Sequence, residues 1–322
     1  SLEDDLAYNG VVYNEMKGAF SSPEGVLDRV VLNTLFPDTS YANESGGDPE
    51  VIPELTYEQF LDFHRRYYHP SNSYIYLYGN MDMEEKLNWL DQEYLSAYDR
   101  KEVDSEIHLQ KPFEQMHDIT KPYSIASNES TEDNTYLSYN KVIGTSLDEK
   151  LYLAFQILDY ALLSAPGAPI TKALLEAGIG KDISGSYDSS TYQPIFSIVA
   201  KNANEEQKAE FVKVIEDTLK TIVENGMDKK ALEAGINYHE FRYREADFGG
   251  YPKGLMYGLQ IFDSWLYDET KPFIHVEALD TFAFLKEQIN TARMNDEHYG
   301  HRAGVIHTEI ESRTCLLYTS PS

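Results

Sequence analysis

The stretch Ile195-Phe-Ser-Ile-Val-Ala200, followed by Asn204-Glu-Glu-Gln207, decides the fold class of this chain. Its first run is rich in β-branched and aromatic residues, which is typical of a strand. Apolar residues then recur at helical spacing through Phe211, Val214, Ile215, Leu219 and Ile222. A strand that leads into a helix with one apolar face indicates a sheet covered by helices.

A similar unit lies earlier in the chain. The run Tyr74-Ile-Tyr-Leu-Tyr78 predicts a strand, and a helix is expected from Asp82 onward. The pairs Glu84-Glu85 and Glu205-Glu206 occupy matching places in the two units. This weak similarity suggests two related α+β domains, with chance recurrence of a common unit as the alternative.

Capping signals and apolar spacing predict the remaining elements. Thr56 and Gln59 form a capping box for a helix through Tyr67, and Ser146 with Glu149 is predicted to cap another. Further helices are expected over 8–20, 23–36, 148–163, 205–223, 228–247, 251–267 and up to 289, with strands around Ile125 and over 136–142. The helices at 148–163 and 205–223 should pack on one face of the sheet, because each carries a single apolar stripe.

The length of 322 residues is enough for about two domains. The charged stretch 99–121 is the best candidate for a linker. We therefore expect a first unit over 1–100, a linker over 101–121, a second unit over 122–227 and a helical hairpin region over 228–293. Residues 294–322 form a tail that these patterns do not assign. The long loop Pro37–Leu55 could be functional, and a plain connection is equally compatible with it.

Composition excludes several classes of function. With 27 basic and 54 acidic residues the formal charge is −27, which opposes the phosphate backbone of nucleic acids. No run of about 18 apolar residues predicts a membrane span, and the start has no signal-peptide pattern. The single cysteine, Cys315, fits a reducing compartment, so the bacterial cytoplasm is expected, with the mitochondrial matrix as the alternative.

Both ends of the sequence are unusual. The chain does not begin with Met, and Cys315–Ser322 resembles the translated end of a sequencing adapter, with a natural disordered tail as the alternative. We expect an internal fragment of a longer protein.

No complete catalytic motif is present in the sequence. None of the nine histidines lies in H-E-x-x-H or H-x-x-E-H spacing, and the serine hydrolase, Walker and dinucleotide-binding motifs are missing. His298, His301 and His307 cluster near the end, where surface exposure is expected rather than ligation.

Three blocks of sequence resemble the presequence protease branch of the pitrilysin and insulin-degrading zinc metallopeptidases, known by their motif as inverzincins. They are Gly10–Gly18, Ser45–Thr56 and Phe63–Asn72. The segment Ala168–Gly178 resembles the second domain of that branch, and Phe248–Gly254 its helical linker. The resemblance implies an α+β fold with repeated domains, each with a mostly antiparallel sheet and helices on one face, followed by a helical hairpin.

The resemblance also implies a function. In that family H-x-x-E-H supplies two His ligands and a general base, and a later Glu is the third zinc ligand; here that residue is Glu15. A catalytic zinc needs three protein ligands and an open position for water, so Glu15 alone is not a site. The complete protein is expected to be a Zn²⁺-dependent endopeptidase that degrades short unstructured peptides, whereas this fragment should be inert. The alternative is a non-catalytic scaffold or partner-binding subunit. His64 and His69 are expected to pack and cap rather than bind metal.

Overall fold

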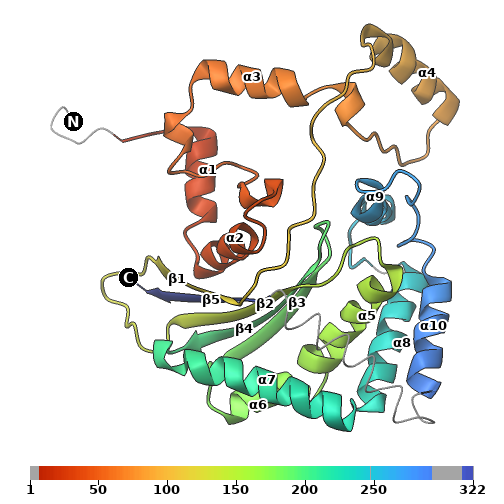
Figure 1. Cartoon of the computed structure of the whole chain (residues 1–322). Helices are drawn as coiled ribbons and strands as arrows, with labels where there is room; N and C mark the ends of the chain where they lie inside the picture. The colour runs from red at the N-terminus through yellow and green to blue at the C-terminus, as the bar shows by residue number, and fades with distance from the viewer. Residues whose placement is uncertain (1–6, 247, 292–313, 322) are drawn as a thin grey trace.

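The computed structural model describes residues 7–246, 248–291 and 314–321 (Figure 1). A twisted sheet lies at the centre, with several helices beneath it and an arm of N-terminal helices above it. Among the described residues no helix combines the length and the apolar character needed to cross a bilayer.

The sheet is mostly antiparallel. Its strand order is β1-β5-β2-β4-β3. The pairs β2–β4, β2–β5 and β3–β4 are antiparallel, and β1–β5 is parallel. The strands are β1 (His117–Tyr123), β2 (Thr135–Val142), β3 (Asp182–Asp188), β4 (Ile195–Ala203) and β5 (Thr314–Pro321). The predicted α+β fold with a mostly antiparallel sheet is thus confirmed.

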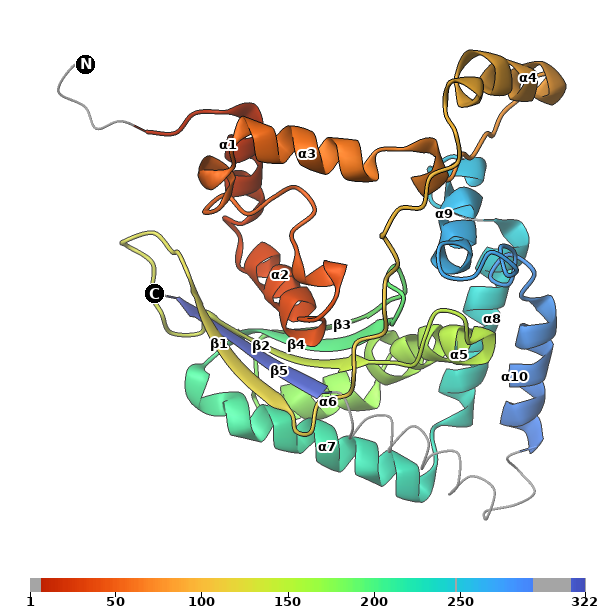
Figure 2. The same cartoon turned by 45° about the horizontal axis from the view of Figure 1, so that its top comes forward.

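One face of the sheet holds the main core. Leu137 of β2 and Ile198 of β4 project to this face, because alternate residues of a strand point the same way. They pack with apolar side chains of the helices α5 (Glu149–Asp159), α6 (Pro169–Glu176) and α7 (Lys208–Asn225). Figure 2 shows these helices together beneath the sheet. The predicted placement of the 148–163 and 205–223 helices on one face is confirmed.

The opposite face is covered by a helix from the first hundred residues. In α2 (Pro23–Leu35), Ser22 caps the first turn by accepting a hydrogen bond from the Gly25 N–H at 3.0 Å, as expected from Ser-Pro. Leu27, Val31 and Leu35 of this helix form a second core with Val142 and Ile195 of the sheet. Helices therefore lie on both faces around β2 and β4, which departs from the expectation of one covered face.

The predicted helical hairpin is present as α8 (Lys229–Glu245) and α9 (Lys253–Trp265), and α10 (Leu279–Thr291) follows it. Gly226 ends α7 with a φ of 81°, a positive value that glycine tolerates because it has no Cβ. Ala246 closes α8 in the left-handed region. Helix α8 packs against α5 and α10, so these helices extend the layer beneath the sheet, whereas α9 lies above them in Figure 1.

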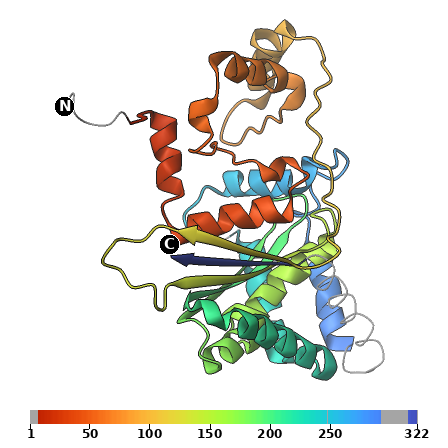
Figure 3. The same cartoon turned by 60° about the vertical axis from the view of Figure 1, so that its left-hand side comes forward.

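The arm consists of α1 (Val11–Ala19), α3 (Tyr57–Tyr67) and α4 (Met83–Glu93), with short 3-10 turns at 40–42, 52–54, 70–72 and 95–97. Thr56 and Gln59 form the predicted capping box of α3. None of these three helices contains a buried residue. Figure 3 shows the arm standing away from the sheet.

Several local predictions were wrong. Tyr74–Tyr78 forms no strand and instead lies across α9, because no neighbouring strand among the described residues pairs with it. Strand β1 begins at His117, inside the predicted linker and before Ile125. Asp148, not Ser146, caps α5, since its carboxylate accepts from the N–H groups of Lys150 and Leu151.

Two strands were not anticipated. Strand β3 was missed because Gly185 and alternating polar residues hide its pattern. Strand β5 lies almost entirely in Cys315–Ser322, the range that resembles adapter sequence. The origin of that range and the domain boundaries stay predictions.

Two neighbouring leucines of α6 offer a matched test of the main core. Leu174 is fully buried, whereas Leu175 is 48% exposed. Leu174→Ala should lower the free energy of unfolding by about 2–5 kcal/mol through lost burial and the cavity left behind. Leu175→Ala should cost less than about 1 kcal/mol. Urea denaturation of both variants measures the difference, and equal losses would contradict the described core.

Candidate functional site

The predicted metal ligand Glu15 lies on α1, on an exposed part of the helix surface. The next residue, Met16, packs on the loop at Gly46. The contact is so close that a Cβ added to Gly46 would lie 2.1 Å from the Met16 sulfur. Asp48 of the same loop pairs with Arg29 of α2. The loop 37–55 is therefore fixed between α1 and α2, which sets the position of Glu15.

Tyr41 of the same loop contacts Tyr192, between β3 and β4, and Tyr267, just after α9. The Tyr41 hydroxyl lies 2.7 Å from the Tyr267 hydroxyl and accepts a hydrogen bond from the Tyr192 N–H at 3.0 Å. The Tyr192 and Tyr267 rings stack with centroids 4.3 Å apart. Burial chiefly raises the pKa of Tyr267, so its hydroxyl stays protonated and makes a structural contact.

The described residues do not make a catalytic zinc site by themselves. No group of three His, Cys, Asp or Glu side chains in residues 7–246, 248–291 or 314–321 could hold a metal ion. Since a catalytic zinc requires three protein ligands, Glu15 has too few partners here. His298, His301 and His307 lie outside the described residues.

His64 and His69 have structural contacts, as expected. The His69 ring accepts a hydrogen bond from the Ser71 N–H at 3.2 Å and so caps the short turn that follows. The His64 ring stacks on Tyr68 with centroids 4.5 Å apart. Both rings therefore support the end of α3.

The segment Tyr74–Tyr78 packs across α9 and joins the arm to the hairpin. Tyr74 contacts Trp265 with ring centroids 4.7 Å apart, and its hydroxyl donates to the Trp265 carbonyl at 3.2 Å. Tyr76 and Tyr78 lie over Gly258 and Gly254. Two residues of an extended chain and four residues of a helix both advance about 6 Å. The spacing between the two tyrosine rings therefore matches the spacing between the two glycines.

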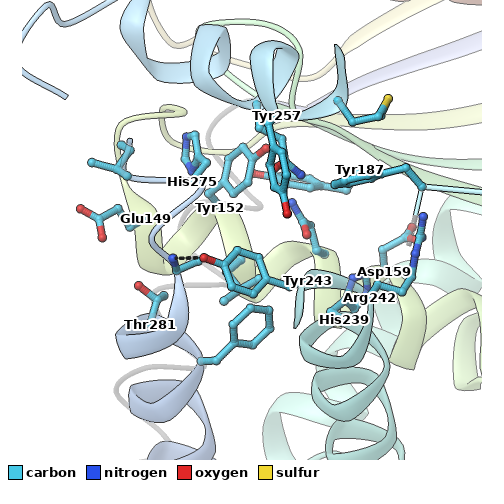
Figure 4. Close-up of a pocket in the computed structure, with 18 residues that line it drawn as sticks. Glu149, Tyr152, Asp159, Tyr187, His239, Arg242, Tyr243, Tyr257, His275 and Thr281 are labelled. Atoms are coloured by element: carbon cyan, nitrogen blue, oxygen red, sulfur yellow. Dashed lines mark hydrogen bonds between the residues drawn. The ribbon is translucent and has the colours of Figure 1, made fainter. Parts of the chain in front are cut away.

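A cavity of about 320 Å³ lies among α5, α8, α9 and α10, with Tyr187 of β3 in its wall (Figure 4). Asp159, His239 and Arg242 gather on one side of it, and Tyr152 with His275 lies on the other. The Tyr243 hydroxyl accepts a hydrogen bond from the Ala278 N–H at 3.1 Å, which fixes the turn before α10. The cavity is therefore built by four helices, and one of them, α9, also contacts the segment Tyr74–Tyr78.

Burial dominates the electrostatics around this cavity. It raises the pKa of Asp159 to about 6 and, despite the hydrogen bond from Tyr152, that of Asp263 to about 7. It lowers the pKa of His275 to about 4 against the opposing effect of a hydrogen bond to the Ser146 backbone, so this ring is neutral at pH 7. The Tyr152 ring stacks on His275 at 3.7 Å, and its hydroxyl donates to Asp263 at 2.9 Å.

The sequence profile of the family described as "Peptidase M16 inactive domain" matches residues 54–238, more than half of the chain. This chain belongs to the M16 peptidase family. The match begins just before α3 and ends within α8, so it covers strands β1 to β4 and the helices α5, α6 and α7, whereas β5 and α10 lie beyond it.

Among M16 relatives, the chain is 50% identical over 294 residues to "Protein HypA" of Clostridium perfringens, covering 91% of this chain and 30% of that protein. It is 37% identical over 290 residues to "Presequence protease 1, chloroplastic/mitochondrial" of Arabidopsis thaliana, covering 89% and 27%. The resemblance to presequence proteases is thus confirmed. The chain spans less than a third of the length of these relatives.

A solved structure has a similar fold. The crystal structure of a protease from Helicobacter pylori matches with a TM-score of 0.67 at 12% identity, covering 96% of this chain and 70% of that one. At this identity the match concerns the fold alone. It agrees with the α+β sheet and helix layers described above.

The sequence analysis did not identify the polar cavity. Most of its residues come from five elements that are distant in the chain, and Phe248 alone belongs to a block that the sequence analysis singled out. The available signal was His239 in α8, a polar ring at helical spacing from Ile236 and Tyr243, but a core histidine has the same pattern. Only the packing of α5 against the hairpin brings these groups together.

The contact between Tyr74–Tyr78 and α9 can be tested by adding two methyl groups. A Cβ at Gly254 would lie 1.9 Å from the Tyr78 ring, and one at Gly258 would lie 2.7 Å from the Tyr76 ring. Gly254→Ala with Gly258→Ala should displace both rings, cost about 1–2 kcal/mol and speed chymotrypsin cleavage after Tyr76 and Tyr78.

The matched control is Gly18→Ala in α1, where a Cβ meets no atom within 4 Å. That change should stabilise its helix by up to about 1 kcal/mol and leave cleavage at Tyr76 unchanged. Unaltered proteolysis of the double variant would show that the segment does not rest on α9.

The raised pKa of the buried Asp263 carboxyl predicts that the stability of the fold depends on pH. Its pKa is raised from 3.8 to about 7, so unfolding releases its proton and its contribution to stability falls as pH rises from about 4 to about 7. Asp263→Asn should therefore raise the free energy of unfolding by about 1–3 kcal/mol at pH 8, and this gain should shrink towards pH 5.

Thermal melts between pH 5 and pH 8 measure that effect. The exposed Asp104→Asn is the control and should change little at any pH. A gain from Asp263→Asn that does not vary with pH would contradict a buried carboxyl with a raised pKa.

Proposed function

We propose that this chain is part of a zinc-dependent endopeptidase that degrades short unstructured peptides, to which it contributes Glu15 as one metal ligand. The observation that carries the proposal is the similarity to presequence proteases over about nine-tenths of the chain. The position of Glu15 supports it, because the carboxylate is exposed on a helix whose neighbouring loop is fixed by contacts. The remaining ligands would come from outside the described residues.

The remainder of a longer polypeptide is the proposed partner of the arm. Helix α3 exposes an apolar stripe that includes Tyr57, 72% exposed, and Phe60, 67% exposed, and Trp89 of α4 is 58% exposed. An amphipathic helix of this length gains most of its stability by burying such a stripe. Covering these side chains would give the arm the core that its three helices lack.

The proposed compartment is the bacterial cytoplasm, supported by the high identity to a clostridial protein. The mitochondrial matrix is the alternative, supported by the organellar names of other relatives. Peptides are the proposed substrates, and nucleic acids are unfavourable partners because of the charge of −27.

A second candidate is a non-catalytic scaffold or partner-binding subunit. It is favoured by the description of the matched family profile as an inactive domain over residues 54–238. The two candidates differ in whether H-x-x-E-H is encoded upstream of Ser1. A reading frame that continues upstream without this motif would favour the scaffold.

The metal role of Glu15 is tested in the longer protein. Glu15→Gln keeps the shape and helix propensity of the side chain but removes its charge, so zinc content and peptide cleavage should fall together while the melting temperature changes little. The control Glu84→Gln, on the exposed surface of α4, should retain both.

The 322-residue chain by itself should hold no stoichiometric zinc and cleave no peptide, as measured by metal analysis and a fluorogenic peptide assay. Full zinc occupancy and normal cleavage by the Glu15→Gln protein would remove Glu15 from the site.

A further inference from the structure

The cavity among α5, α8, α9 and α10 collects most of the buried polar atoms that lack a hydrogen-bond partner. Across the described residues six buried side-chain atoms have none, and five belong to residues that line this cavity. They are Asp159 Oδ1, the Tyr187 hydroxyl, His239 Nε2, Gln260 Oε1 and His275 Nε2. Since a buried polar atom without a partner is destabilising, this concentration indicates a place where a bound group supplies the hydrogen bonds.

The two histidines are arranged as hydrogen-bond acceptors. His275 is 94% buried, since its exposed fraction is 6%, and its ring bonds to the backbone of Ser146 while Nε2 has no partner. The His239 ring bonds in the same way to the backbone of Gln156. A neutral imidazole that donates from Nδ1 to a carbonyl carries its lone pair on Nε2. Both Nε2 atoms can therefore only accept hydrogen bonds.

The other three groups without a partner can also accept hydrogen bonds. Asp159 Oδ1 and Gln260 Oε1 are acceptors, and the Tyr187 hydroxyl can donate or accept. Asp159 lies where α5 passes into the π-helical turn Tyr160–Ser164, a local irregularity that is frequent at functional sites. The cavity thus presents at least four acceptors, one of them a carboxylate whose pKa is raised because burial disfavours its charge.

The walls between these acceptors are aromatic. Tyr152, Tyr243, Tyr257, Phe248 and Phe282 line the cavity. The charged side chains in the lining are Glu149, Asp159 and Arg242, and Arg242 is exposed and lies over the Tyr238 ring at 5.6 Å. Aromatic faces together with a carboxylate favour a cation, above all a planar guanidinium. A volume of about 320 Å³ fits one extended side chain or a small molecule of similar size.

We propose that this cavity binds a cation that donates N–H hydrogen bonds, a guanidinium or ammonium group on an aliphatic stem, with Asp159 as its counter-ion. The group could belong to a basic side chain of a peptide or to a free small amine, because both present the same chemistry. The peptide source rests on the proposed peptidase function, whereas cation binding itself does not.

The test uses the purified 322-residue chain, without zinc or cleavage. Isothermal titration calorimetry compares Nα-acetyl-arginine methylamide with its citrulline counterpart, which has the same length but no charge. The arginine compound should bind at least tenfold more tightly, because the citrulline group places a carbonyl oxygen among the acceptors. Agmatine, a free guanidinium amine, distinguishes the sources: tighter binding of agmatine indicates a free amine, and tighter binding of the arginine compound indicates a peptide.

Variants connect that binding to the cavity. Asp159→Asn keeps the shape of the side chain and should weaken binding of the arginine compound at least tenfold, whereas the exposed Asp91→Asn on α4 should not alter it. Gln260→Met removes one acceptor with little change in volume and should weaken binding about threefold. It serves as the second test if Asp159→Asn does not fold, which its melting curve reveals.

Three results would overturn the proposal. They are the absence of binding at millimolar concentrations, equal affinity for the arginine and citrulline compounds, and affinity that is unchanged in a folded Asp159→Asn or Gln260→Met variant. None of them bears on Glu15 or on peptide cleavage, so failure of this inference is distinguishable from failure of the proposed function.

Discussion

The antiparallel pairing of β2 with β4 is the constraint on which the rest of the structure depends. Every residue of β2 is buried, so this strand requires cover on both faces. Leu137 and Ile198 face the helices α5, α6 and α7, and Val142 and Ile195 face α2. Because α2 belongs to the first hundred residues, the sheet ties the arm to the second unit through an apolar interface rather than a loose linker. The loop that carries Asp48 follows α2, and so the surroundings of Glu15 are fixed by the same interface.

Two further contacts hold the arm in place. One is the tyrosine cluster of Tyr41, Tyr192 and Tyr267, and the other is the packing of Tyr74–Tyr78 across α9. Both join residues separated by more than a hundred positions, and both end on the helical hairpin region or the turn after it. A change in that region would therefore affect the loop beside Glu15 and the segment before α4 together. The exposed apolar stripes of α3 and α4 remain on the outer side of this arrangement.

The helical hairpin also forms part of the wall of the polar cavity. Helices α8 and α10 pack on α5 through apolar residues, yet they leave a volume among them in which acceptor atoms gather. The raised pKa values of Asp159 and Asp263 have a common cause in burial. Asp263 has a donor in Tyr152, while Asp159 Oδ1 has none, so the two carboxyl groups have different roles. The first accepts a hydrogen bond from Tyr152 in the wall of the cavity, and the second faces the space within it.

The sequence by itself determined the elements whose signals are local. Ser22-Pro23, the Thr56–Gln59 capping box, Asn225-Gly226 and the apolar stripe from Phe211 to Ile222 place α2, α3 and α7 correctly, because caps and periodicity act within one helix. Glu15 was predicted as a ligand only from the resemblance of Gly10–Gly18 to presequence proteases. No spacing pattern could distinguish it from any other exposed glutamate. Tertiary structure decided the rest. Tyr74–Tyr78 has the composition of a strand, but a strand exists only with a partner, and here α9 supplies the contact instead. The cavity was equally hidden, since its acceptors lie on separate elements and become a set only when α5, the hairpin and α10 pack together.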